Sequence, residues 1–159
     1  MARVMRGVAS IVTPILAVLA LAACGGGTST KEKNAYAQSV NAAQRKFAST
    51  VTTVAKQTGP KSSVSQQQRT LRRFQAAIVG VVGDLRRIEP PSEVSKEHEQ
   101  LVSVMRGFGN DIGQANEAMR HPTLRAIELA KRRVATATRS VNARVDAAVA
   151  AINVKLNGK

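Results

Sequence analysis

Residues 71–88 read Leu-Arg-Arg-Phe-Gln-Ala-Ala-Ile-Val-Gly-Val-Val-Gly-Asp-Leu-Arg-Arg-Ile. The large apolar side chains of this stretch recur at alternating intervals of three and four residues, and they are Leu71, Phe74, Ile78, Val81, Leu85 and Ile88. This is the a/d spacing of a heptad, which places all of them on one face of an α-helix. One such apolar seam cannot bury itself, so the helix must pack against others.

The same spacing continues outward from this stretch in both directions. It extends the helix to 63–88 and defines three further seams, in segments 31–57, 92–120 and 123–156. The seam of 31–57 is Tyr36, Val40, Ala43, Phe47, Val51 and Val54; that of 92–120 is Val94, His98, Leu101, Met105, Phe108, Ile112, Ala115 and Met119; that of 123–156 is Ile127, Val134, Thr138, Val141, Val145, Ala148, Ile152 and Leu156. Amphipathic helices of this length with short connections are expected to fold as antiparallel neighbours around a common core. The sequence therefore predicts an all-α domain over 31–159, an up-down-up-down four-helix bundle. An aromatic content of 3% argues against a β-sandwich.

Helix start and stop signals agree with these segments. Ser29 with Glu32, and Ser63 with Gln66, have the spacing of a capping box. Ser92 is expected to cap the third helix. The breaks between segments are Gly59-Pro60, Pro90-Pro91 and His121-Pro122. The last of these is either a turn or a kink that lets the final two helices run on, and the sequence leaves both open.

The N-terminus has the layout of an export signal. Residues 1–6 contain Arg3 and Arg6 and no acid, and residues 7–23 carry no charge. A basic start before an apolar run is typical of a secretory signal peptide. The run is marginal for a membrane span of about 20 residues, and Pro14 interrupts it, so a plain transmembrane anchor is disfavoured.

The apolar run ends in Leu21-Ala22-Ala23-Cys24, followed by three glycines. This order resembles the lipobox of bacterial lipoproteins. The resemblance implies that the signal peptidase recognises Leu21, Ala22 and Ala23 and removes residues 1–23. It also implies diacylglyceryl and N-acyl lipid on Cys24, the only cofactor expected, and attachment to the extracytoplasmic face of the cell membrane. Residues 24–30 would then form a flexible tether.

The remainder of the chain is rich in alanine and arginine. In composition and layout it looks like the small helical lipoproteins of high-GC bacteria such as actinobacteria. That likeness implies a location at the cell envelope and no particular activity.

Positive charge dominates the chain, with 24 Lys+Arg against 10 Asp+Glu and a formal charge of +14. Only segment 92–120 is acidic, with five acids against three bases, so ion pairs to its flanking helices are expected. The exposed basic pairs and the densest basic run form a candidate surface for an anionic partner, and they are Arg72, Arg73, Arg86, Arg87, Lys131, Arg132 and Arg133. The alternative is that this charge serves solubility alone.

For an exported lipoprotein, the anionic partners to consider are phospholipid headgroups, wall polymers and an acidic protein. Nucleic acid is disfavoured because Tyr36, Phe47, Phe74 and Phe108 all lie on the apolar seams, which leaves no aromatic ring free to stack on a base.

Glycines interrupt two of the predicted helices. Gly80 and Gly83 lie in the second helix, and Gly107, Gly109 and Gly113 lie in the third. Each destabilises a helix by about 1 kcal/mol relative to alanine. Because these positions lie off the seams, they predict a close helix approach or a docking surface.

No arrangement of residues for catalysis or metal binding is readable. His98 lies on the third seam, which predicts a core histidine, and His121 lies at a helix break. Glu117 and His121 are four residues apart, but a di-iron bundle needs several further carboxylates and a second histidine. One cysteine in the whole chain excludes a disulfide framework and a Cys-rich metal site.

The sequence thus favours a lipid-anchored, non-enzymatic binding or accessory module of the cell envelope. The alternative is a structural spacer, an electrostatic linker between the membrane and an anionic wall polymer. The oligomeric state and the identity of the ligand stay open.

Overall fold

The computed structural model describes residues 29–56 and 62–157. Within these residues the chain forms long α-helices, one short 3-10 helix and no strand. The elements are α2 (Thr30–Lys56), α3 (Val64–Arg86), η1 (Ser92–Val94), α4 (Ser95–Ala118) and α5 (Leu124–Leu156). The predicted all-α fold is confirmed. Residues 1–23, predicted to be a signal peptide, lie outside the described residues, as do Cys24 and the break at Gly59-Pro60.

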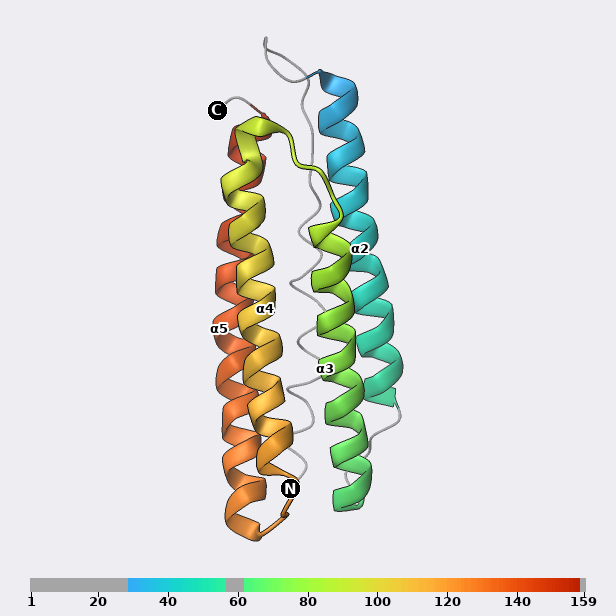
Figure 1. Cartoon of the computed structure of the whole chain (residues 1–159), viewed down its shortest axis with the longest axis vertical. Helices are drawn as coiled ribbons and strands as arrows, with labels where there is room; N and C mark the ends of the chain where they lie inside the picture. The colour runs from blue at the N-terminus through green and yellow to red at the C-terminus, as the bar shows by residue number, and fades with distance from the viewer. Residues whose placement is uncertain (1–28, 57–61, 158–159) are drawn as a thin grey trace.

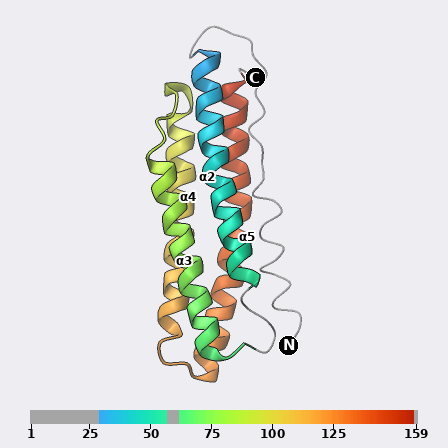
Figure 2. The same cartoon turned by 90° about the vertical axis from the view of Figure 1, so that its right-hand side faces the viewer.

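Successive helices run in opposite directions along one long axis (Figure 1). Helix α3 packs against α2 and α4, and α4 packs in turn against α5. At one end of the bundle the Lys33 Nζ donates to the Leu156 backbone oxygen at 3.0 Å, which joins the start of α2 to the end of α5 (Figure 2). The topology is therefore the predicted up-down-up-down bundle. The 33 residues of α5 give it a length of about 50 Å.

Capping boxes begin two of the helices, as the sequence predicts. At α2 the Glu32 N–H donates to Ser29 Oγ at 3.2 Å, and Glu32 Oε2 accepts from the Ser29 N–H at 2.9 Å. At α3 Ser63 and Gln66 form the same reciprocal pair. Because Ser29 caps α2, Thr30 is already helical, and the predicted tether is shorter by that residue.

The third helix does not begin as predicted, because Ser92 makes no side-chain cap. Residues Ser92–Val94 form η1, and α4 begins at Ser95 after Val94, which also provides no capping hydrogen bond. Val94 is completely buried. We attribute the start of α4 to this apolar anchor in the core, which takes the place of a polar cap.

The break at His121-Pro122 is a turn and not a kink. Helix α4 ends at Ala118, and α5 begins at Leu124 in the opposite direction. Thr123 caps the new helix, since its Oγ1 accepts from the Ala126 N–H at 3.1 Å. Proline at this point removes a backbone donor and excludes helical geometry from the residue before it.

The four predicted seams meet in one core. Each helix supplies at least one side chain with 0% exposure, among them Val40, Ile78, Ile112 and Ile152. Phe74 stacks on Phe47 and meets Phe108 edge-on, with ring centroids 6.4 and 5.7 Å apart. The seam residues that are only half-buried are Leu71, Ile88, Ile127 and Val134.

Two glycines of α4 face side chains of α3. A Cβ added at Gly109 would lie 3.2 Å from Ile78 Cγ2, and one at Gly113 would lie 2.7 Å from Gln75 Nε2. At Gly109 a methyl group would require the branched carbon of Ile78 to shift by a few tenths of an ångström, whereas at Gly113 the contact is with the flexible end of Gln75, which can move aside. The predicted close approach is therefore confirmed at Gly109.

Candidate docking groove

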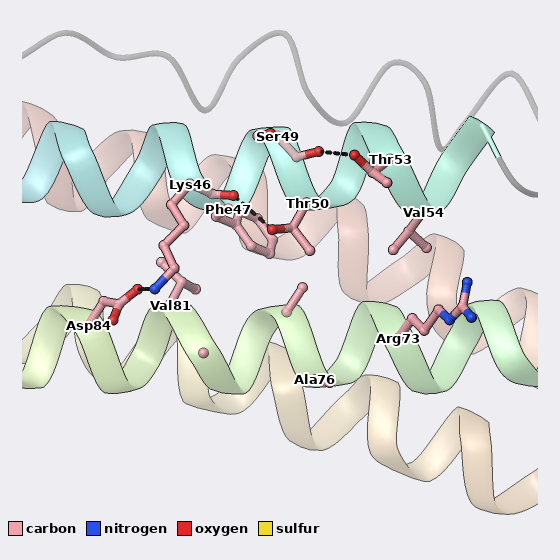
Figure 3. Close-up of a pocket in the computed structure, with 12 residues that line it drawn as sticks. Lys46, Phe47, Ser49, Thr50, Thr53, Val54, Arg73, Ala76, Val81 and Asp84 are labelled. Atoms are coloured by element: carbon pink, nitrogen blue, oxygen red, sulfur yellow. Dashed lines mark hydrogen bonds and ion pairs between the residues drawn. The ribbon is translucent and has the colours of Figure 1, made fainter.

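A groove of about 530 Å³ runs between α2 and α3 (Figure 3). Its apolar surface comes from Phe47 and Val54 of α2 and from Ala77 and Val81 of α3, together with the bare backbone at Gly80. A mostly apolar concave surface with a few polar groups is the usual character of a binding site in proteins.

The groove exists because α3 presents small residues toward α2. Ala76, Ala77 and Gly80 line it over one helical turn. No atom lies within 4 Å of a Cβ added at Gly80, so space is open above this residue. The larger seam residues of α3, such as Ile78, point instead into the fully buried core.

Threonines on the α2 side of the groove have their hydroxyl groups satisfied within their own helix. Thr50 Oγ1 donates to the Lys46 carbonyl at 2.9 Å, and Thr53 Oγ1 donates to the Ser49 carbonyl at 3.0 Å. These hydroxyl groups need no partner from outside. A ligand in the groove would therefore not have to provide hydrogen bonds to these two hydroxyl groups.

Cations flank the groove at both ends. At one end Lys46 Nζ lies 2.8 Å from Asp84 Oδ2, and Arg87 also pairs with this carboxylate. The hydrogen bond from Lys46 is the main cause that lowers the pKa of Asp84, and the two positive charges add to it. Asp84 is thus ionised and neutralised by its partners. Arg73 lies at the opposite end of the groove (Figure 3).

All seven basic residues of the predicted anionic-partner surface are exposed. The structure places them on two separate surfaces, because α4 packs between α3 and α5. The α3 surface carries Arg72, Arg73, Arg86 and Arg87. The α5 surface carries Lys131, Arg132 and Arg133.

The basic residues on α5 lie close to polar partners. Lys131 Nζ pairs with Glu128 Oε1 at 3.2 Å, and Arg133 donates to Gln114 on α4. Arg132 makes no hydrogen bond or ion pair with the described residues, and the same holds for Arg72 and Arg86 on α3. The ion pairs expected between the acidic segment 92–120 and its flanking helices are found on the α5 side, where Lys155 Nζ lies 2.9 Å from Glu97 Oε1. Glu93 of the same segment instead pairs with Lys33 of α2, at 2.9 Å.

His98 is a core residue, as its place on the seam predicts. Its Nε2 lies 3.0 Å from the Leu85 carbonyl, and its Nδ1 lies 3.1 Å from the Tyr36 hydroxyl. A carbonyl can only accept, so Nε2 carries the hydrogen and the Tyr36 O–H donates to Nδ1. Burial lowers the pKa of His98, which keeps the ring neutral, and burial raises the pKa of Tyr36. This cluster ties α2, α3 and α4 together.

The described residues hold no group of three His, Cys, Asp or Glu side chains placed to bind a metal ion. Glu117 pairs with Arg120 at 3.0 Å, and His121 is exposed in the turn that follows. The only buried histidine, His98, has both nitrogens engaged.

Comparisons with known proteins give no family for this chain. No family model, no curated protein and no solved structure matches it. A membrane-spanning segment is not found among the helices of residues 30–56 and 64–156. Residues 21–24, which carry the lipobox resemblance, lie outside the described residues.

The groove itself was missed at the level of sequence. Heptad spacing identifies the core face of α3, but it does not say which residues beside that face meet α2. The available signal was the run Ala76-Ala77 followed by Gly80, small residues next to a seam. Gly80 was recognised as unusual, whereas Thr50 and Thr53 on the facing helix carried no signal at all.

Proposed function

We propose that this protein is a non-enzymatic binding module, held at the extracytoplasmic face of the membrane by lipid on Cys24. In this proposal the partner binds on the basic half of the bundle formed by α2 and α3. The lipobox-like order Leu21-Ala22-Ala23-Cys24 and the uncharged run before it support the anchoring. Two acyl chains are enough for stable attachment to a bilayer.

The observation that carries the binding role is the groove between α2 and α3. It combines an apolar surface with cations at both ends, Lys46 and Arg73. Helix α2 has five basic residues against one acid, and its neighbour α3 has four against one. An anionic partner with an apolar side would match both features.

The groove lies well away from the tethered end of the bundle. Its α2 residues, Lys46 to Val54, follow Thr30 by 16 to 24 residues. At 1.5 Å per residue, the groove is about 24–36 Å along the helix from the point where the tether enters. An upright bundle would therefore offer the groove to a partner beyond the headgroup layer.

Fractionation of cells that produce Cys24→Ser tests the anchoring. We expect this variant to lose palmitate labelling and to leave the membrane fraction. If it stays processed, labelled and membrane-bound as the parent protein does, the lipoprotein assignment is wrong.

Site-specific photo-crosslinking in cells tests the binding role. A crosslinker at Thr53, in the groove, should capture one defined species, whereas a crosslinker at Asn110, exposed on α4, should not. Capture of the same mixture from both positions, or from neither, would contradict a groove-bound partner.

A spacer role is the second candidate, and the basic surface on α5 favours it. Lys131, Arg132 and Arg133 lie on α5, which does not line the groove, so exposed positive charge is present on more than one helix. A spacer would bind anionic liposomes or wall material broadly and release them in salt. A substitution that fills the groove should leave this broad, salt-sensitive binding unchanged.

A further inference from the structure

Positive charge is concentrated at the end of the bundle opposite the start of α2. This end is formed by the start of α3, the turn between α4 and α5, and the start of α5 (Figure 1). Residues 62–73 and 117–133, which we call the distal end, contain eight basic residues against two acidic ones. At the other end, residues 29–34, 88–99 and 150–157 contain four basic residues against five acidic ones. The bundle is therefore strongly basic at the distal end and nearly neutral at the end where α2 begins.

The distal end also exposes two leucines. Leu124 is 86% exposed and Leu129 is 47% exposed, whereas every other leucine of residues 29–56 and 62–157 is buried or half-buried. Side chains of an α-helix lean toward its N-terminus. Because α5 begins at Leu124, this side chain leans past the end of the helix, where the core does not use it.

Fewer helices cover the core at the distal end. Helices α3 and α5 extend past the end of α2 at Lys56 in both views (Figure 1 and Figure 2). The seam residues Leu71, Ile127 and Val134 at this level are only half-buried, and they pack against a small separate cluster that contains Met119. Partly exposed apolar surface therefore accompanies the two exposed leucines.

Arginines at the distal end are available to an anion. Arg69, Arg125 and Arg132 make no hydrogen bond or ion pair with the described residues. Arg125 follows Leu124 directly, and Arg132 lies about 12 Å from Leu124 along α5. Protruding apolar side chains among cations are the combination that binds the interface of an anionic bilayer. A soluble polyanion would use the cations and leave Leu124 in water.

We propose that the distal end of the bundle binds the surface of an anionic phospholipid bilayer, with Leu124 in the headgroup layer and the unpaired arginines close to headgroup phosphates. Leu124 lies about 50 Å along α5 from the contact between Lys33 and Leu156 at the other end. This inference goes beyond the proposed binding role and does not rest on it, because the surface is not the α2–α3 groove. Together with lipid on Cys24, it gives the protein a membrane contact at each end.

Sedimentation with vesicles tests the proposal. The full-length protein in nanodiscs of phosphatidylcholine is mixed with sucrose-loaded vesicles, which pellet while free nanodiscs do not. We expect the parent protein to pellet with phosphatidylglycerol vesicles and not with phosphatidylcholine vesicles. Leu124→Ser should weaken this binding by at least about tenfold. The matched control is Val154→Ser, an exposed valine at the other end of the same helix, and it should leave binding unchanged.

Charge reversal on α5 separates local contact from the net charge of the protein. Arg125→Glu should weaken binding to phosphatidylglycerol vesicles by about fivefold or more. Arg144→Glu makes the same change at an exposed position in the middle of α5, away from the distal end, and it should have little effect because charge is screened over about 8–10 Å.

An introduced tryptophan reports whether the distal end enters the bilayer, since the chain contains no tryptophan of its own. The emission of Leu124→Trp should shift to shorter wavelength when phosphatidylglycerol vesicles bind, and that of Val154→Trp should not. Unshifted emission from Leu124→Trp on bound vesicles would contradict insertion. Full competition by soluble polyphosphate in that case would assign the arginines to a soluble polyanion instead.

Three further results would overturn the inference. They are equal losses from Arg125→Glu and Arg144→Glu, a Leu124→Ser variant that binds as well as the parent protein, and phosphatidylcholine vesicles that bind as well as phosphatidylglycerol ones. Circular dichroism checks that the variants are folded, which is expected because the substituted side chains are exposed. Fractionation of Cys24→Ser and crosslinking from Thr53 are separate measurements, so the proposed function can survive such a failure.

Discussion

Alanine at Gly107 and alanine at Gly109 should change stability in opposite directions, although both glycines lie in α4 two residues apart. Replacing a helical glycine with alanine stabilises the helix by about 1 kcal/mol. At Gly107 the new Cβ meets nothing within 4 Å, so the whole gain is expected. At Gly109 the Cβ would lie 3.2 Å from Ile78 Cγ2, and Ile78 is completely buried, so the shift that it must make disturbs the packed core around it. Overpacking of this kind destabilises by about 1–3 kcal/mol, which leaves Gly109→Ala less stable than the parent by up to about 2 kcal/mol.

Urea and thermal unfolding followed by circular dichroism measure this difference. Gly107→Ala should raise Tm by roughly 3–5 °C, and Gly109→Ala should lower it. Ile78→Leu removes the branched Cγ2 methyl group, so it should recover part of the loss when combined with Gly109→Ala, as a double-mutant cycle would reveal. If Gly109→Ala stabilises the protein as much as Gly107→Ala does, α3 and α4 are not in close contact at this level.

Three further predictions concern the buried histidine and a helix cap. Burial holds the pKa of His98 below its usual 6.5, so the unfolded chain takes up a proton first as the pH falls. The free energy of unfolding should therefore decrease from about pH 7.5 downward, and His98→Gln should flatten this dependence in urea titrations. Tyr36→Phe leaves His98 Nδ1 without its donor and should destabilise the protein by about 1–3 kcal/mol, whereas an unchanged midpoint would show that the hydrogen bond is not made. Ser63→Ala removes the acceptor for the Gln66 N–H and should lower stability by about 1 kcal/mol, with Ser63→Gly losing less.

The fold follows from the sequence because each helix buries a seam that the spacing alone identifies. Val40, Ile78, Ile112 and Ile152 were placed on seams and have no exposed surface. The prediction weakens near helix ends, where fewer neighbours cover a side chain. Ile88, just past the end of α3, is accordingly only half-buried.

The start of α4 was predicted wrongly for an instructive reason. Ser92 has the residue type and position of an N-cap, and local sequence rules favour it. The preceding Pro90-Pro91 and the burial of Val94 instead produce a 3-10 turn, and α4 begins three residues later. Tertiary packing of one apolar side chain outweighs a capping bond of about 1 kcal/mol.

The glycines divide into two groups that the sequence could not separate. At Gly109 the neighbouring helix fills the space, while at Gly80 the space is open. Each glycine is next to a seam residue of an amphipathic helix, so the heptad pattern alone does not predict which of them contacts another helix. They differ in whether a side chain of another helix lies opposite, as Ile78 of α3 does at Gly109, and that depends on residues distant in sequence.

Charge alone does not discriminate between a binding module and a spacer. Helix α5 carries as dense a basic run as α3, at Lys131, Arg132 and Arg133, and none of its residues lines the α2–α3 groove. A spacer needs only charge, and either surface would serve. A binding module needs charge together with shape, and the α2–α3 side combines the two. A variant that reverses the charge on α5 and one that fills the groove at Gly80 therefore separate the two roles: the first should reduce broad binding to anionic polymers, and the second should abolish capture of a single partner.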